Sequence, residues 1–181
     1  MRPAPRPRRR LQCTPGLALA LVLGCATQSA SGGRGGDSPR GLDLTLPDVQ
    51  GNMVTPTAET GKEIFVLVFW ATWCQPCQQE LTKMDALHEA MQPRGLRIYA
   101  VSIDGPDTSS QVMPWVQREG YRFEVLLDRE TEVLTRFNPR GDIPYYVVLD
   151  ADGKILKDHQ GYNSGDVDDL AAFLETVLPT G

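Results

Sequence analysis

Runs of apolar residues along the chain predict the strands of a sheet. Ile64–Trp70 contains seven consecutive apolar residues rich in β-branched and aromatic types. A run of this length and composition is typical of a strand buried on both faces. Further strands are predicted at Leu96–Ile103, Phe123–Leu127, Tyr145–Leu149 and Lys154–Lys157, the last two joined by a hairpin turn at Asp152-Gly153.

Helices are predicted between and after these strands. Their ranges are Gln75–Gln92, Ser109–Glu119, Glu130–Phe137 and Asp166–Leu178. One face of the first helix carries Leu81, Met84, Leu87, His88 and Met91, and one face of the last carries Val167, Leu170, Phe173, Leu174 and Val177. Strands that alternate with helices predict an α/β domain over residues 41–181, with parallel strand pairs in a central mixed sheet flanked by helices.

A shorter pattern precedes this domain core. Leu42, Leu44 and Leu46 alternate with polar residues, which predicts a strand that ends at Pro47. A turn is expected at Gly51-Asn52, and Met53–Thr55 is expected to return beside the first strand. The domain should therefore begin with an N-terminal β-hairpin extension.

The first 24 residues have the composition of a secretory signal peptide. Five Arg lie within the first ten positions, no acidic residue comes before Asp37, and Leu17–Leu23 is continuously apolar. A basic segment followed by a short apolar core is typical of a signal peptide. The alternative, a transmembrane anchor, needs about 20 apolar residues, so we predict that residues 1–24 are removed.

Cys25 lies where such a signal would end. The run Leu21-Val22-Leu23-Gly24-Cys25 resembles the lipobox of bacterial lipoproteins, which implies cleavage before Cys25 and attachment of a lipid to its thiol. Ordinary cleavage after Ala26 is the alternative. By the usual lipoprotein sorting pattern, Ala rather than Asp after the cysteine favours the outer membrane over the inner one. Residues 25–40 are small and polar, which predicts a flexible tether.

Charge excludes one class of partner. The whole chain has a net charge of −5, and removing residues 1–24 leaves 13 basic and 23 acidic residues, a net charge of −10. Nothing in this balance would neutralise phosphates, so a nucleic-acid partner is not expected. Docking on anionic lipid by charge alone is not expected either.

Cys74 and Cys77 are the cysteines that remain when those of the signal segment and the lipid site are set aside. They follow a buried strand and open a helix, where unpaired N–H groups and a partial positive charge favour a thiolate. We therefore expect Cys74 to be the exposed nucleophile and Cys77, one turn inside the helix, to be the shielded resolving thiol. Pro76 fits the first helical turn because it needs no N–H partner there.

Two other interpretations of this pair are weaker. A purely structural disulfide would close a very small loop and constrain little of the unfolded chain. A zinc site would need two more ligands, and the two histidines, His88 on a helix and His159 after the last predicted strand, are not evidently placed to supply them. No metal site is therefore expected, and the redox-active disulfide is expected to serve in place of a cofactor.

The segment Phe69–Leu81, with Val101–Asp104 and Ile143–Pro144, resembles the thioredoxin superfamily. Within it, the chain is similar to the membrane-anchored thiol-disulfide oxidoreductases such as TlpA and ResA. The resemblance implies a thioredoxin fold and a cis peptide bond before Pro144, which would face the cysteine pair. The substrate-binding residues that it implies are Trp73, Gln75, Pro76, Ile143 and Pro144. Tyr145 and Tyr146 depart from the family pattern, which leaves the substrate open.

Glu80 matches the acidic residue of the family's Cys-x-x-Pro-Cys-x-x-Glu pattern. Typical thioredoxin instead has a buried carboxylate at the position of Val68, so Glu80 is the candidate for handling the proton of Cys77. A solvated glutamate on the helix surface is the alternative. Trp70 and Trp73 are expected to pack around this site.

The predicted function is reduction of protein disulfides on the periplasmic side of the cell envelope by a lipid-anchored protein. The resemblance implies a membrane thiol transporter as electron donor and clients that contain disulfides, with apocytochrome c among the candidates through its Cys-x-x-Cys-His motif. Two alternatives stay open. One is a copper-binding thioredoxin-like chaperone, and the other is a disulfide oxidase or isomerase, because the residues between the cysteines do not fix the redox potential.

Overall fold

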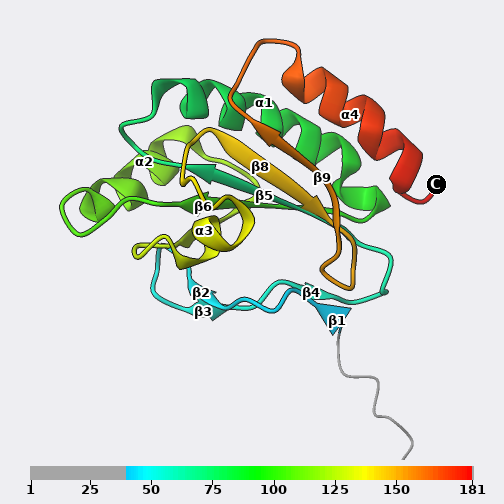
Figure 1. Cartoon of the computed structure of the whole chain (residues 1–181), viewed down its shortest axis with the longest axis horizontal. Coiled ribbons are helices and arrows are strands. Elements are labelled where there is room, and N and C mark those ends of the chain that lie inside the picture. Colours follow the sequence, from blue (N-terminus) through cyan, green and yellow to red (C-terminus); the bar gives the residue numbers. More distant parts are fainter. Residues whose placement is uncertain (1–39, 181) are drawn as a thin grey trace, which may run out of the picture. The chain divides into compact units, whose positions relative to one another are not determined.

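The apolar run Ile64–Trp70 forms β5, the central strand of a five-stranded sheet. The computed structural model describes residues 40–180, in which the strand order is β7 (Glu124–Leu127), β6 (Leu96–Ser102), β5, β8 (Tyr145–Leu149) and β9 (Ile155–Gln160) (Figure 1). β5, β6 and β7 are parallel, whereas β8 is antiparallel to β5 and to β9. The predicted central mixed sheet is confirmed.

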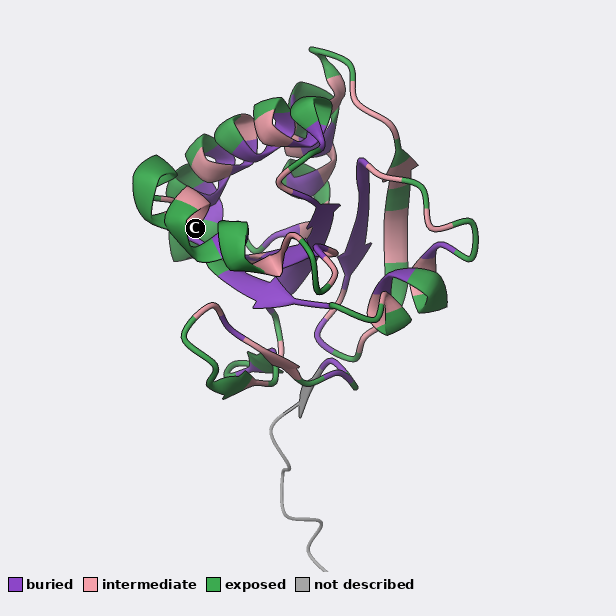
Figure 2. Cartoon of the chain, turned by 90° about the vertical axis from the view of Figure 1, so that its left-hand side faces the viewer, coloured by how far each residue is buried: buried purple, intermediate pink, exposed green. Residues whose placement is uncertain are grey.

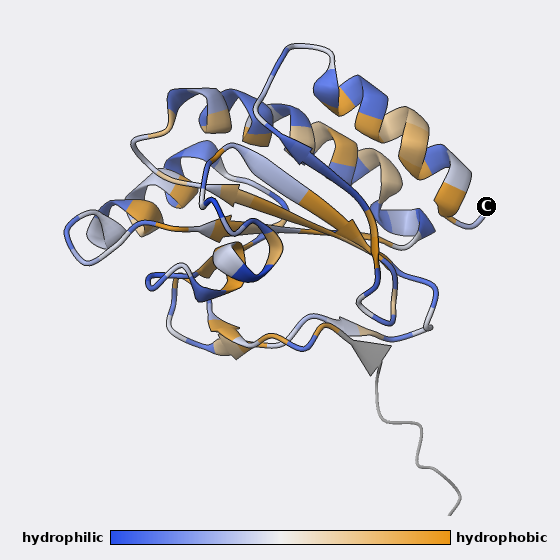
Figure 3. Ribbon diagram, viewed as in Figure 1, coloured by the Kyte–Doolittle hydropathy of each residue, from blue (hydrophilic) through white to orange (hydrophobic). Residues whose placement is uncertain are grey.

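Helices and the N-terminal segment cover the two faces of this sheet. One hydrophobic core joins the sheet to α1 (Gln75–Met91), α2 (Val112–Glu119) and α4 (Asp166–Val177). A second core joins the other face to α3 (Glu132–Phe137) and the segment before β5. Buried residues accordingly lie on the sheet and on the inward faces of the helices (Figure 2). Hydrophobic positions are concentrated in the central strands, while β9 is largely hydrophilic (Figure 3).

The N-terminal extension differs from its prediction. Instead of one strand from Leu42 to Leu46, the chain forms four two-residue strands, paired as β1 (Arg40–Gly41) with β4 (Thr57–Ala58) and β2 (Leu46–Pro47) with β3 (Met53–Val54). The β2–β3 hairpin is as expected. The prediction of one continuous strand is wrong, because Leu42 and Leu44 are buried in the second core without a paired strand beside them. The alternation of apolar and polar residues therefore indicated which side chains face the core, but it did not indicate hydrogen-bonded pairing with another strand.

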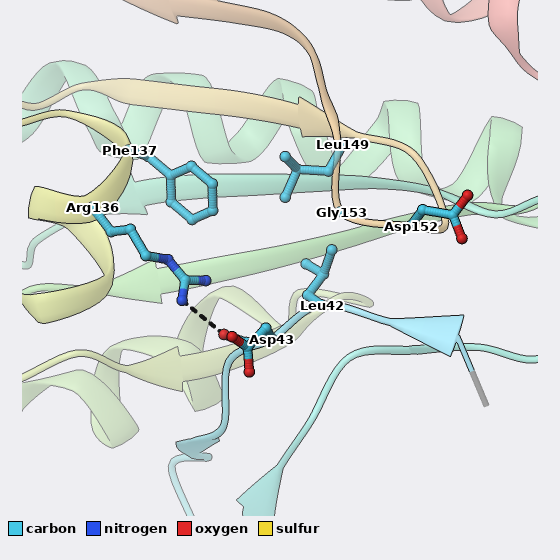
Figure 4. Close-up of a pocket in the computed structure, with 7 residues that line it drawn as sticks. All are labelled: Leu42, Asp43, Arg136, Phe137, Leu149, Asp152 and Gly153. Carbon is cyan, nitrogen blue, oxygen red and sulfur yellow. Dashed lines mark hydrogen bonds between the residues drawn. The ribbon is translucent and has the colours of Figure 1, made fainter. Parts of the chain in front are cut away.

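Leu42 and Asp43 line a shallow pocket with residues of α3 and of the end of β8 (Figure 4). The guanidinium of Arg136 donates a hydrogen bond of 2.8 Å to the backbone carbonyl of Asp43, which fastens the extension to α3. Leu149 in this pocket pairs with Phe65, near the start of β5. The pocket therefore lies at the end of the sheet opposite to the one that leads into the cysteine pair.

The predicted helices are present with small shifts at their ends. α1 ends at Met91 and continues as the 3-10 turn η1 (Gln92–Arg94), while α2 is preceded by the 3-10 turn η2 (Ser109–Gln111). The last strand is longer than predicted, because β9 continues to Gln160. His159 therefore lies within β9, opposite Tyr146, and not after the strand as expected.

Several predictions concern residues outside those described. The signal peptide of residues 1–24, most of the tether of residues 25–40 and the lipid site Cys25 fall in this part of the chain. Within residues 40–180, none of the helices combines the length and the apolar character that crossing a bilayer requires.

Candidate active site

The cysteine pair lies where β5 passes into α1. Cys74 is the N-cap of α1, and its sulfur accepts a hydrogen bond of 3.3 Å from the backbone N–H of Cys77. The two residues form a disulfide with their Cα atoms 5.3 Å apart. Pro76 lies in the first turn, as predicted. A sulfur that caps a helix N-terminus receives both an N–H donor and the positive end of the helix dipole, which stabilise a thiolate there.

Cys74 is more exposed than Cys77, as expected, but its exposed fraction is smaller than expected. Cys77 has no exposed surface, as the role of a shielded thiol requires. Cys74 is only 6% exposed, so in the oxidised protein it is less accessible than a fully exposed nucleophile would be. Of the two cysteines, only Cys74 has surface in contact with solvent.

Asp104 holds the loop that leads to Cys74, a role that the sequence did not assign. Its carboxylate accepts bonds from the backbone N–H of Thr72 at 2.9 Å, from the Thr72 hydroxyl at 2.6 Å and from the Ser102 hydroxyl at 2.9 Å. Asp104 is 1% exposed, and a buried carboxylate is tolerated when such donors satisfy it. The Val101–Asp104 motif pointed to Asp104 as a family residue, but nothing in the sequence shows that the Asp104 carboxylate contacts Thr72.

Pro144 lies at the same end of the sheet as the cysteines. The peptide bond Ile143–Pro144 is cis, as the resemblance implied. The next residue, Tyr145, pairs with Phe69 near the end of β5, so Pro144 is placed close to the start of the loop that carries Cys74. The Pro144 carbonyl accepts bonds of 2.8 Å from the backbone of Gly161 and from the side chain of Gln160, which fix this turn.

An exposed rim surrounds Cys74. Trp73 is 62% exposed, and Gln75 and Pro76 are also exposed, so all three are available to a partner molecule. The expectation that Trp73 packs around the site is wrong, because the loop turns its indole outward. Trp70 is fully buried, as expected, and its ring lies 6.4 Å from that of Trp115.

Glu80 is fully buried on the inner face of α1, one turn beyond Cys77. Neither carboxylate oxygen has a hydrogen-bond partner among the described residues. Burial, with the negative charge of Asp166 as a second cause, raises the pKa of Glu80 to about 8. The alternative of a solvated surface glutamate is therefore wrong. The position on β5 where typical thioredoxin has a carboxylate is occupied by Val68, which is fully buried.

The two histidines have separate surroundings. His88 is buried on α1 with its ring edge-on to Phe123, and burial lowers its pKa. His159 lies on β9, where its Nε2 is 3.0 Å from the carboxylate of Asp166. Among residues 40–180, the His, Cys, Asp and Glu side chains form no group of three or more that could hold a metal ion.

Several known proteins are similar to this chain in sequence or in fold. The model of the AhpC/TSA family matches residues 40–157. The thiol-disulfide oxidoreductase ResA of Geobacillus thermodenitrificans is 32% identical over 137 residues, which cover 76% of this chain and 75% of that protein. Among solved structures, an uncharacterised thioredoxin-like protein of Porphyromonas gingivalis is 30% identical with a TM-score of 0.60, covering 74% of this chain and 89% of the other.

A second solved structure agrees in fold at lower identity. It is a thiol:disulfide interchange protein of the thioredoxin family from Chlorobium tepidum, with a TM-score of 0.61 at 21% identity, covering 77% of this chain and 97% of the other. The thioredoxin fold predicted from the sequence is confirmed.

Replacing Glu80 with Gln is expected to remove a pH-dependent loss of stability from the oxidised protein. The pKa of Glu80 is about 8 when folded and has its ordinary value of 4.5 when unfolded. Between these values the unfolded chain releases a proton that the folded protein keeps, so the free energy of unfolding falls with rising pH. For a shift of this size the fall between pH 5 and pH 8 is ~3 kcal/mol.

Urea unfolding at both pH values, with the disulfide intact, measures this difference. Glu89→Gln is the matched control, because Glu89 lies exposed on the same helix, and its pH dependence should follow the wild type. If Glu80→Gln also shows the wild-type pH dependence, the buried carboxyl does not have the raised pKa.

Proposed function

Since this chain belongs to the AhpC/TSA family and is a thiol-disulfide oxidoreductase, we propose that it reduces disulfide bonds of other proteins on the extracytoplasmic side of a bacterial membrane. The observation that carries the proposal is that the two cysteines at the N-terminus of α1 differ in exposure to solvent. Cys74 caps α1 at the rim of the protein, while Cys77 has no exposed surface. One thiol can meet a client, and the other can act only after the first has done so.

The reaction is a pair of thiol-disulfide exchanges. The thiolate of reduced Cys74 attacks one sulfur of the client disulfide, forming a mixed disulfide and releasing one client cysteine as a thiolate that takes a proton from water. Cys77 loses its proton and attacks the sulfur of Cys74, and the second client cysteine leaves. The client gains two electrons, and the protein is left with the Cys74–Cys77 disulfide that the structure contains.

Glu80 is proposed to take the proton of Cys77 in the second exchange. Cys77 is excluded from water, so its proton needs an acceptor inside the protein. Glu80 lies one turn further along α1, and in the oxidised form its pKa of about 8 means that it holds a proton at neutral pH. That is the protonation state expected after it has taken the proton of Cys77. When an electron donor opens the disulfide, Glu80 can return the proton to Cys77.

The cellular setting of the proposal comes from the first 40 residues and from the family resemblance. A cleaved signal peptide and a lipid on Cys25 would hold the protein at the periplasmic side of the cell envelope, with the outer membrane favoured. A membrane thiol transporter would supply electrons. The exposed rim of Trp73, Gln75 and Pro76, with Ile143 and Pro144 beside it, would bind the client, and apocytochrome c is a candidate client.

The two cysteines are expected to trap clients unequally. Cys77→Ser should accumulate a mixed disulfide with an oxidised peptide that contains Cys-x-x-Cys-His, because attack proceeds and resolution fails. Cys74→Ser should form none, since the remaining thiol is buried. Mass spectrometry of each variant after incubation with the peptide gives the result. Equal trapping by both variants would show that the roles are wrongly assigned.

Glu80→Gln is expected to slow the release of the client by about 10²-fold, the lower end of a general-base contribution. The initial attack by Cys74 should keep its rate, which makes it the internal control. The variant should also lower the pKa of the Cys77 thiol, because an ionised carboxylate disfavours a nearby thiolate. Stopped-flow kinetics and thiol titration measure the two effects. Unchanged release and unchanged titration would leave Glu80 without a role in the exchange.

The direction of electron flow is expected to appear in the reduction potential of the Cys74–Cys77 couple. A reductase should lie below the value of protein disulfide isomerase, about −180 mV, and towards that of thioredoxin, about −270 mV. Equilibration with glutathione or dithiothreitol buffers measures it. A potential near that of the oxidase DsbA, about −120 mV, would favour the oxidase alternative instead.

A further inference from the structure

A polar row of residues crosses the sheet beneath α1 and ends at α4. Tyr146 on β8 pairs with Val68 on one side and with His159 on the other, so the three side chains share one face of the sheet. Tyr146 and Val68 belong to the core that α1 and α4 cover. The rings of Tyr146 and His159 are stacked with centroids 5.3 Å apart, and His159 is 3.0 Å from Asp166 at the start of α4.

Asp166 is held from two sides. Besides the contact with His159, its carboxylate accepts a hydrogen bond from the backbone N–H of Asn163. Burial raises the pKa of Asp166, but the bonds from Asn163 and the contact with His159 outweigh burial and keep that pKa below its usual value. Asp166 is therefore a fixed anion with a side chain that is only 13% exposed.

This anion faces the part of α1 that carries Glu80. The ammonium of Lys83, one turn beyond Glu80, donates to the carbonyl of Ser164, two residues before Asp166. Val167, which follows Asp166, packs in the same core as Cys77 and Leu81 of α1. The start of α4 is thus fastened over the first turns of α1.

We propose that Asp166, positioned by His159, raises the pH at which Glu80 exchanges its proton. Glu80 has no hydrogen-bond partner among the described residues, so burial and nearby charge, rather than hydrogen bonding, govern its ionisation. The titratable groups that face it are Tyr146 from β8 and Asp166 from α4, while Cys77 and Lys83 lie one turn away on either side along α1. His159 and Asp169 lie beside Tyr146, and Asp158 is on the opposite face of the sheet, where it meets Tyr145. Of the carboxylates, Asp158 and Asp169 act on Tyr146, while Asp166 acts on both Tyr146 and Glu80.

The consequence is a proton held more firmly on Glu80. An anion fixed at the start of α4 disfavours a second anion at Glu80, so Glu80 stays protonated to higher pH than burial alone would require. Asp166 and His159 are positioning residues here, since neither touches the sulfur atoms.

The proposal rests on the role of Glu80 in the proposed function, and its test separates the two. The carboxyl carbon of Glu80 is followed by NMR during a pH titration of the oxidised, isotope-labelled protein, which needs no client and no turnover. Asp166→Asn keeps the shape of the side chain and removes its charge. The titration midpoint of Glu80 should fall from about 8, by ~0.5–1 pH unit for loss of one partly screened charge.

Two further variants make the result specific. Asp168→Asn removes a carboxylate from the same first turn of α4, where it has the same interaction with the helix dipole but is exposed, and it should leave the midpoint unchanged. Asp166→Glu restores the charge and should restore most of the wild-type midpoint. Equal shifts in Asp166→Asn and Asp168→Asn, or no shift in either, would overturn the proposal. A shift in Asp166→Asn alone would support it even if Glu80→Gln released clients at the wild-type rate, an outcome that would contradict only the proposed function.

Discussion

Exclusion of water from both faces of β5 is the constraint on which the rest of the structure depends. All seven residues of this strand are buried, so each face of the sheet needs its own cover. α1, α2 and α4 supply one cover, and α3 with the N-terminal extension supplies the other. Because β5 is fixed between β6 and β8, the position of its last residue fixes where the following loop begins. That loop leads to Cys74, the N-cap of α1. Asp104, at the end of the neighbouring strand, then holds this loop through Thr72.

The chemistry of the site comes from two opposite electrostatic environments within two turns of one helix. At the N-cap, the sulfur of Cys74 meets a backbone N–H and the positive end of the helix dipole. Two turns along, Glu80 lies in a core where no described group donates to it and the anion of Asp166 opposes its ionisation. The first environment favours negative charge and the second favours a bound proton. Cys77 lies between these two environments.

The core that excludes water from Glu80 also contains Tyr146, which links this part of the core to β9 at the edge of the sheet. Tyr146 stands where the resemblance leads one to expect a smaller residue, and its ring reaches His159 on β9. Tyr146, His159 and Asp166 thus form a polar row from the sheet beneath α1 to the start of α4, and Tyr146 is the member of it that departs from the family pattern. The fold is common to the similar solved structures.

The sequence by itself determined the order of strands and helices, the thioredoxin fold, the redox pair and the cis proline, because each depends on local composition or on a short motif. Only the tertiary structure decided what lies around them. It showed that Trp73 is exposed, that Leu42 and Leu44 are buried without forming one strand, and that Glu80 is buried rather than solvated. It also brought Asp104 to Thr72, which is 32 residues away, and it placed His159 of β9 against Asp166 of the following helix. The periodicity of a sequence indicates which side of a helix or strand is apolar. The element that packs against each side is fixed only in the tertiary structure, and the burial and charge of the site residues depend on that element.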